Sequence, residues 1–129
     1  MVLKREESPL RTKSEAFSVR ISQLYRYLQN TKGERMVATQ IYRCGTSIGA
    51  NIAEGNFAQS ELDMISKFSI ALKEAGETSY WLKNLFATGL IDEKGFQSMM
   101  SDNTELIKML TSSIITLKKK QSGQSTNKG

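Results

Sequence analysis

Apolar residues recur at helical spacing in four separate stretches of this chain, and that periodicity constrains its fold more than any other feature. The clearest stripe has steps of four, three, four and four residues and consists of Val37, Ile41, Cys44, Ile48 and Ile52. Such spacing places side chains on one face of an amphipathic helix. The stretches predict helices over about 13–30 and about 34–54, from Ser60 to Gly89, and from Asp92 to the lysines at 118–120.

Short polar links separate the predicted helices. Thr12 followed three residues later by Glu15 is a capping-box pattern, and Gly55 is expected to end the second helix in the left-handed conformation. Because such short links join neighbouring helices side by side, we predict an all-α protein, an antiparallel up-down-up-down four-helix bundle. The expected organisation is an irregular lead-in over 1–11, a bundle over 12–120 and a disordered tail over 121–129.

Gly45 and Gly49 lie inside the predicted second helix, where each costs roughly 1 kcal/mol relative to alanine. Four residues apart, they share one helix face, and with Ala38 and Ala53 they form a smooth strip. The strip has two interpretations. Either a neighbouring helix of the same chain crosses closely at this face, or the strip faces a partner subunit or a ligand.

Three polar or aromatic residues of the first two helices also need an interpretation. Asn51, at helical spacing from Ser47, is expected to be a buried residue that forms hydrogen bonds across helices and fixes their register. Tyr25 and Tyr27 are expected to pack at the core edge or on a neighbour rather than to stack on nucleic acid.

The chain contains no histidine and one cysteine, Cys44. Without histidine the commonest general base and the Glu-x-x-His pairs of di-metal bundles are excluded, and one cysteine excludes an internal disulfide. Glu54, Glu74 and Glu77 are expected to be surface or interface charges. We therefore predict that the protein is not an enzyme and uses no metal, cofactor or small-molecule substrate. The sequence shows no membrane-span or signal-peptide pattern, so we expect a cytoplasmic location.

The formal net charge of +5 is unevenly distributed. Residues 12–55 carry six basic and three acidic side chains, whereas residues 56–117 carry five basic and eight acidic ones, so the two hairpins have charges of +3 and −3. This split either helps the hairpins to pack within one chain or favours head-to-tail contact between copies, which can close into a ring. Together with the glycine strip, it leads us to expect a homo-oligomer.

A long motif in this chain matches a known pattern. The motif begins with the run 43–55, which includes Arg43, Gly45, Thr46, Ser47, Gly49, Asn51, Glu54 and Gly55. It continues through 60–67 (Ser60, Asp63, Lys67), 70–75 and 77–82. It resembles the bacterial four-helix-bundle family whose reading frames occur in intervening sequences of 23S rRNA genes, and whose members are sometimes labelled ribosomal proteins. The likeness spans about residues 9–118. Cys44 replaces the serine that the family more often has, which changes no functional expectation.

The resemblance implies a bundle that assembles as a homopentameric ring, and for most members no biochemical activity is established. A similar branch, the accessory proteins of diversity-generating retroelements, binds RNA and reverse transcriptase through a basic ring surface. We therefore expect a non-enzymatic, ring-forming binding or scaffold module for RNA or an RNA-processing protein. The alternative is a purely protein-binding oligomer with no nucleic-acid role. The candidate RNA-binding residues are Arg20, Arg26, Lys32, Arg35, Arg43, Lys118, Lys119 and Lys120.

Overall fold

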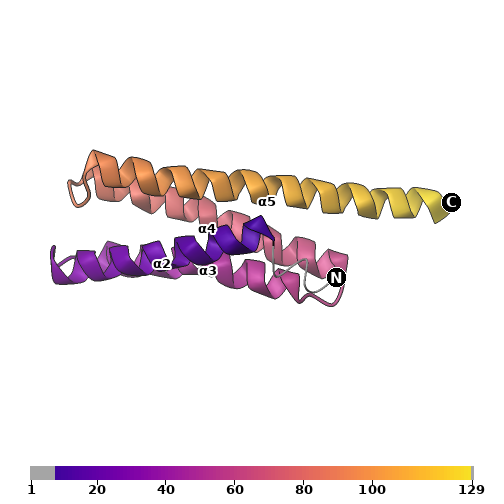
Figure 1. Ribbon diagram of the computed structural model, residues 1–129, viewed down its shortest axis with the longest axis horizontal. Coiled ribbons are helices and arrows are strands. Elements are labelled where there is room, and N and C mark those ends of the chain that lie inside the picture. Colours follow the sequence, from indigo (N-terminus) through magenta and orange to yellow (C-terminus); the bar gives the residue numbers. More distant parts are fainter. Residues whose placement is uncertain (1–7, 129) are drawn as a thin grey trace.

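The computed structural model describes residues 8–128, with side chains described as far as Gly123. The described chain forms four α-helices: α2 (Pro9–Asn30), α3 (Met36–Asn56), α4 (Glu61–Ala87) and α5 (Glu93–Lys128). Successive helices run antiparallel and pack side by side (Figure 1). The prediction of an all-α, up-down-up-down four-helix bundle is confirmed.

The first helix begins earlier than the capping box at Thr12 predicts. Ser8 is the N-cap, its hydroxyl oxygen accepts a hydrogen bond from the Arg11 backbone N–H at 3.1 Å, and Pro9 follows at the first helical position. Proline suits that position because its fixed φ is helical and its missing N–H would have no partner there. Glu15 therefore makes no capping box and instead forms an ion pair with Arg11 at 2.9 Å. Of the lead-in predicted over 1–11, residues 9–11 are helical, and residues 1–7 lie outside the described chain.

The other helix boundaries follow the sequence signals more closely. The side-chain oxygen of Ser60 accepts a hydrogen bond from the Asp63 backbone N–H, and a carboxylate oxygen of Asp92 accepts one from the Gly95 backbone N–H at 2.7 Å. Gly33 and Gly89 adopt positive φ values of 65° and 78° in the turns after α2 and α4. Left-handed backbone is where glycine carries no steric penalty, so these two residues can reverse the chain at the same end of the bundle.

Gly55 does not end α3, contrary to the prediction. The helix continues to Asn56, and the positive-φ glycines among the described residues do not include Gly55. A Cβ at position 55 would lie 2.6 Å from Cε1 of Phe68 in α4. Glycine is needed at this position because the ring of Phe68 occupies the space that a side chain would fill.

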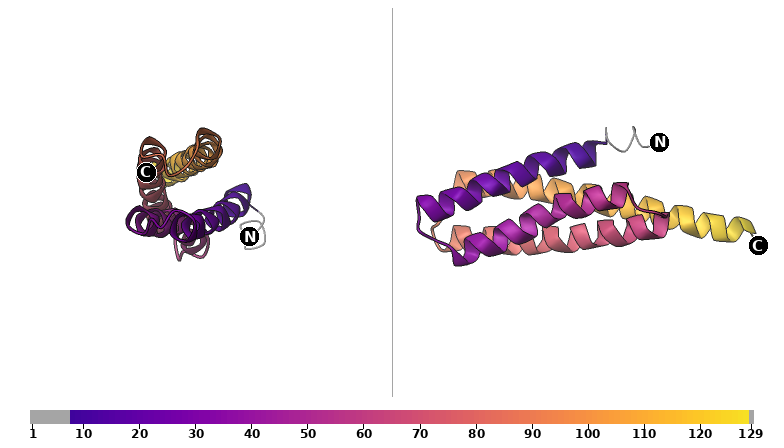
Figure 2. Two further views of the ribbon diagram at one scale, coloured as in Figure 1. Left: turned by 90° about the vertical axis from the view of Figure 1, so that its left-hand side faces the viewer. Right: turned by 90° about the horizontal axis from the view of Figure 1, so that it is seen from below.

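The predicted disordered tail is also at variance with the structure, in which α5 continues through it to Lys128. Residues 121–128 contain no proline. Once a helix is nucleated, each further residue adds a hydrogen bond at little cost, and the backbone of α5 continues beyond Lys120 as a helix. Figures 1 and 2 show this C-terminal part projecting beyond the other helices.

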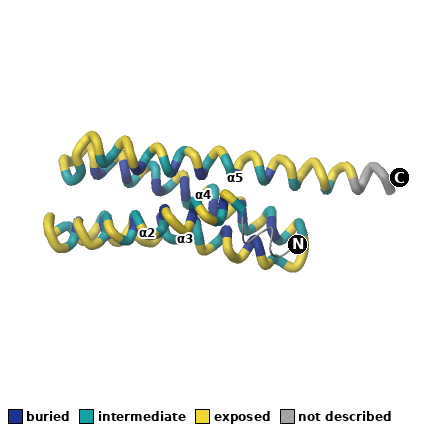
Figure 3. Tube along the Cα trace, viewed as in Figure 1, coloured by how far each residue is buried: buried dark blue, intermediate teal, exposed yellow. Residues whose placement is uncertain are grey.

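The predicted apolar stripes meet along the inner faces of the helices, where buried residues alternate with exposed ones at helical spacing (Figure 3). The most fully buried side chains include Phe17, Ile21, Leu28, Ile41, Ile48, Ile52, Leu82, Leu85, Leu106 and Leu110. The buried Asn103 bonds across helices, since its amide donates to the Ala75 carbonyl at 2.9 Å and to the Ser79 hydroxyl at 2.7 Å. Asn51 donates to the Ser47 carbonyl within its own helix, so our prediction for Asn51 was wrong.

Candidate nucleic-acid interface

The glycine strip of α3 packs against α2 of the same chain. A Cβ at position 45 would lie 2.8 Å from side-chain atoms of Ile21, and one at position 49 would lie 3.0 Å from the hydroxyl of Ser18. Ala53 is exposed and lies outside this contact. The geometry supports the first interpretation of the strip, in which the missing side chains allow two helices of one chain to approach closely.

The polar residues of the same motif form hydrogen bonds mainly within α3. The Thr46 hydroxyl donates to the Tyr42 carbonyl at 2.6 Å, and the Ser47 hydroxyl donates to the Arg43 carbonyl at 2.7 Å. With the bond from Asn51 to Ser47, these contacts use local backbone acceptors one turn earlier in the helix. These side chains therefore contribute to the structure of α3 and do not converge on a ligand site.

Arg43 joins α3 to α4 through an acidic pair. Its guanidinium donates to a carboxylate oxygen of Glu77 at 2.7 Å and lies 3.9 Å from the carboxylate of Glu74. The Trp81 indole N–H donates to the same Glu77 oxygen at 3.1 Å. This hydrogen bond from Trp81, together with Arg43, lowers the pKa of Glu77. Arg43 was a candidate RNA-binding residue, but its charge is compensated within the chain.

Cys44 is fully buried, as the apolar stripe predicts. Burial raises the pKa of its thiol, and the Thr78 hydroxyl lies 3.3 Å from its sulfur. A thiol kept protonated is a poor nucleophile. Cys44 therefore behaves as a core side chain.

A compact set of ion pairs joins α2 to α5, the neighbouring pair of helices with the fewest contacts. Asp102 accepts a hydrogen bond from the Arg20 guanidinium at 2.6 Å and lies 3.5 Å from the Lys13 ammonium. Lys13 also pairs with Glu105 at 2.6 Å, and Arg20 donates to the Ser98 hydroxyl at 2.9 Å. Like Arg43, the candidate RNA-binding residue Arg20 therefore has its charge compensated by carboxylates of the second hairpin.

Three of the six basic residues in the first hairpin remain, namely Arg26, Lys32 and Arg35, which we call the turn cluster. All three are exposed and lie within ten residues of one another across the α2–α3 turn. Within the described chain, none of the three forms an ion pair. Three basic side chains of the first hairpin are thus paired with carboxylates of the second hairpin within the chain. The other three, the turn cluster, lie at one end of the bundle, unpaired within the part of the chain that the structure describes.

The lysines at the end of the predicted fourth helix lie on the part of α5 that extends away from the turn cluster. Lys120 pairs with Glu61 at 2.7 Å, and the Gln121 amide donates to the same carboxylate group. Lys118 and Lys119 are exposed and form no ion pair with the described residues. The candidate cations that form no ion pair with the described residues are therefore the turn cluster and, at the opposite end of the bundle, Lys118 and Lys119.

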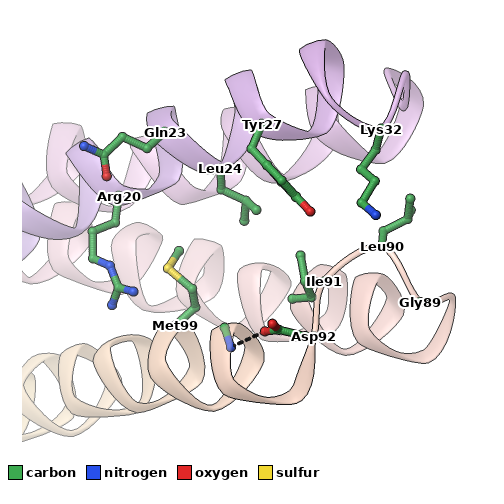
Figure 4. Close-up of a pocket in the computed structure, with 11 residues that line it drawn as sticks. Arg20, Gln23, Leu24, Tyr27, Lys32, Gly89, Leu90, Ile91, Asp92 and Met99 are labelled. Carbon is green, nitrogen blue, oxygen red and sulfur yellow. Dashed lines mark hydrogen bonds between the residues drawn. The ribbon is translucent and has the colours of Figure 1, made fainter.

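A pocket with a volume of about 640 Å³ opens beside the turn cluster, between α2 and the start of α5. In Figure 4, Leu24 and Tyr27 of α2 point toward Ile91 and Met99 on the opposite side. Leu90 adds to the apolar wall at the α4–α5 turn. We did not predict this pocket, although two apolar residues directly after the turn glycine, Leu90 and Ile91, were a signal that this turn packs against something.

The polar groups of the pocket differ in how far they are already engaged. Arg20 is held by Asp102, and a carboxylate oxygen of Asp92 accepts from the Gly95 N–H. Lys32, from the turn cluster, also lines the pocket, and its ammonium group points toward Leu90 in the α4–α5 turn (Figure 4). The pocket therefore combines apolar side chains on both walls with polar and charged groups, among them Lys32.

Two other kinds of site are absent from the described residues. Nowhere between residues 8 and 128 do three or more Cys, Asp or Glu side chains gather closely enough to hold a metal ion. None of the four helices, over its described length, is apolar enough to cross a membrane.

Comparison with known proteins now places the chain. The sequence pattern of the 23S rRNA-intervening sequence protein family matches residues 6–112. The chain belongs to this family. A solved structure from Bacteroides thetaiotaomicron, a protein of unknown function from the S23 ribosomal protein family, is 48% identical and superposes with a TM-score of 0.81. The match covers 81% of this chain and 94% of that one. No curated protein gives a significant match.

Membership of the 23S rRNA-intervening sequence protein family confirms the resemblance noted in the sequence. The matched region includes the turn cluster, the pocket and the ion pairs between α2 and α5, all of which lie before residue 112. Lys118, Lys119 and Lys120 lie beyond it. The turn end of the bundle is therefore the part of the candidate interface that belongs to the family's matched region.

Proposed function

We propose that this protein is a non-enzymatic binding or scaffold module of the cytoplasm that contacts RNA through the turn cluster. One observation carries the proposal. Arg26, Lys32 and Arg35 keep uncompensated charge at one exposed end of the bundle, whereas Arg20, Arg43 and Lys13 are paired with carboxylates. Exposed cations of this kind can contact phosphate groups, and such contacts supply most of the affinity when a protein binds nucleic acid without sequence preference.

The test is RNA affinity as a function of salt concentration. The wild type is compared with a variant in which Arg26, Lys32 and Arg35 are all changed to Gln, and with a version that ends at Leu117. A matched control changes Lys73, Lys83 and Lys108 to Gln, because these lysines are also exposed and lie outside the cluster. Each lost phosphate contact should reduce the slope of log K against log salt by about 0.7 for single strands, so the cluster variant should lose about 2.

The outcomes separate the hypotheses. A reduced slope in the cluster variant, with the control unchanged, supports the proposal. A reduced slope only in the shortened version assigns RNA binding to the lysines of α5 instead. If neither the wild type nor any variant binds RNA at low salt, the purely protein-binding alternative stands, for which Phe57 and Leu62 beside the α3–α4 turn, 66% and 65% exposed, offer apolar contact area.

We further propose that the chains assemble into a homo-oligomeric ring, with five chains favoured by the family resemblance. The glycine strip no longer supports this, because it packs inside the chain. The support that remains is the set of large apolar side chains exposed on the outside of the bundle, above all Met36, Phe57 and Leu62. A ring would repeat the turn cluster in every chain and so raise avidity for RNA. Light scattering after size exclusion tests this, and a particle of 14.5 kDa at tens of micromolar would contradict it.

A further inference from the structure

The pocket beside the turn cluster has the size and lining of a ligand site. Its volume of about 640 Å³ lies within the range of roughly 300–1,000 Å³ that is usual for sites of small organic molecules. Both walls carry apolar side chains beside polar ones, with Leu24 from α2 facing Ile91 and Met99 from the α4–α5 side (Figure 4). A planar or compact apolar group would bury its surface between them.

The polar groups at the pocket specify the rest of an occupant. Asp92 and Arg20 are engaged by Gly95 and Asp102, whereas the ammonium of Lys32 forms no ion pair with the described residues. An anionic group of the occupant would therefore meet Lys32. The ring of Tyr27 points into the opening and offers both an aromatic face and a hydroxyl group. A heteroaromatic ring can both stack on the tyrosine ring and hydrogen-bond to its hydroxyl, which an aliphatic group cannot do by stacking.

We propose that this pocket binds a nucleoside monophosphate unit, with its base between Tyr27 and the wall formed by Ile91 and Met99, and its phosphate at Lys32. The inference rests on the proposed function in one respect, since it names the part of an RNA that the bundle would take up. The same unit can come from two sources, a free mononucleotide or an unstacked nucleotide of single-stranded RNA. In either case a base is bound by shape and stacking, and a phosphate by charge.

Two pocket variants and one control test the proposal in the full-length protein. Tyr27→Leu removes the stacking ring and the hydroxyl, and Ile91→Trp fills the pocket. Tyr80→Leu is the matched control, because Tyr80 is an exposed tyrosine on α4 that packs edge-on against Trp81 and lies outside the pocket. Circular dichroism checks that all three variants fold. The readouts are anisotropy of a labelled single-stranded RNA at low salt, and saturation-transfer NMR with adenosine and uridine monophosphates.

Both pocket variants should weaken RNA binding roughly tenfold, since stacking of one base contributes about 1–3 kcal/mol. The salt slope should stay unchanged, because the phosphate contacts remain, and Tyr80→Leu should bind as the wild type does. If the wild type binds no RNA but shows saturation transfer from mononucleotides that both variants abolish, the pocket proposal stands with free nucleotides as the source, and the proposed function fails. If both variants bind RNA as well as the wild type, and no mononucleotide shows transfer, the pocket proposal is overturned while RNA binding by the turn cluster stands.

Discussion

The two sides of the bundle are built differently. On one side α3 lies against α2 and α4 at glycines, with Gly45 against Ile21 and Gly55 against Phe68, so that backbones and apolar side chains meet without room for an added Cβ. On the other side α2 and α5 contact each other least, and ion pairs centred on Asp102 join them. Association of α3 with its neighbours therefore depends on close steric fit, and association of α2 with α5 depends on ion pairs.

The same difference separates the residues that serve packing from those available to bind a ligand. The run 43–55 of the family motif lies on α3, and most of its glycine and hydroxyl residues serve packing or local hydrogen bonds. The pocket lies where α2 faces α5, and the turn cluster lies at the adjoining turn. The most recognisable residues in the sequence are therefore not the ones that the structure offers to a ligand.

The largest expected effect concerns the glycine contacts. Gly45→Val should lower the free energy of unfolding by about 2–3 kcal/mol, because the new side chain must displace Ile21 in a filled core. Gly76 is the matched control, since it lies in the interior of α4 and a Cβ added there would have nothing within 4 Å. Gly76→Val should change stability by less than about 0.5 kcal/mol, because glycine and valine have similar helix propensities. Urea unfolding at equal protein concentration measures both, and equal losses would remove the distinction between the sites.

A smaller effect is expected from the ion pairs. Asp102→Ala should cost about 1 kcal/mol, because the carboxylate pairs with both Arg20 and Lys13 between the two neighbouring helices that contact each other least. Glu54→Ala removes the ion pair with Lys67 between the closely packed helices α3 and α4, and should cost less than about 0.5 kcal/mol. The difference should shrink in 1 M salt, where exposed charges are screened. A larger loss for Glu54→Ala would show that the α2–α5 side does not depend on its ion pairs.

The smallest expected effect is a dependence of stability on pH through Glu77. Its folded-state pKa is lowered by the hydrogen bond from Trp81 and by Arg43, so its contribution is complete above the unfolded pKa of about 4.3 and is lost as the pH falls through the folded value. Glu77→Gln should therefore flatten the loss of stability below about pH 5 and leave the α2–α5 side unchanged. Urea unfolding at pH 3 to 7 measures this, and identical pH profiles for wild type and variant would contradict it.

The periodicity of apolar residues was enough to predict the number of helices, their order and the buried stripe of α3. The helix ends were harder, because Ser8-Pro9 and Thr12 both carry start signals and only the first forms a cap. Gly55 shows the same difficulty, since glycine can end a helix or make room for a neighbour, and the choice depends on where Phe68 lies.

The candidate site was harder still to predict, because it depends on tertiary structure. All the candidate cations look alike in the sequence, and they differ only through partners that lie far along the chain, such as Asp102 for Arg20 and Glu77 for Arg43. Periodicity identified the core because the buried face of each helix is visible as apolar residues at helical spacing within that helix's own sequence. It could not predict which charges are neutralised by another helix, or that a pocket opens beside Lys32.

Hydrogen exchange with and without single-stranded RNA at low salt is the most direct test of the account. We predict that RNA slows amide exchange in peptides covering residues 23–35 and 88–99, which contain the turn cluster and the pocket walls, and leaves the central part of α3, 41–52, unchanged. Protection centred on α3, or confined to α5 beyond residue 112, would contradict the assignment of RNA binding to the turn end of the bundle.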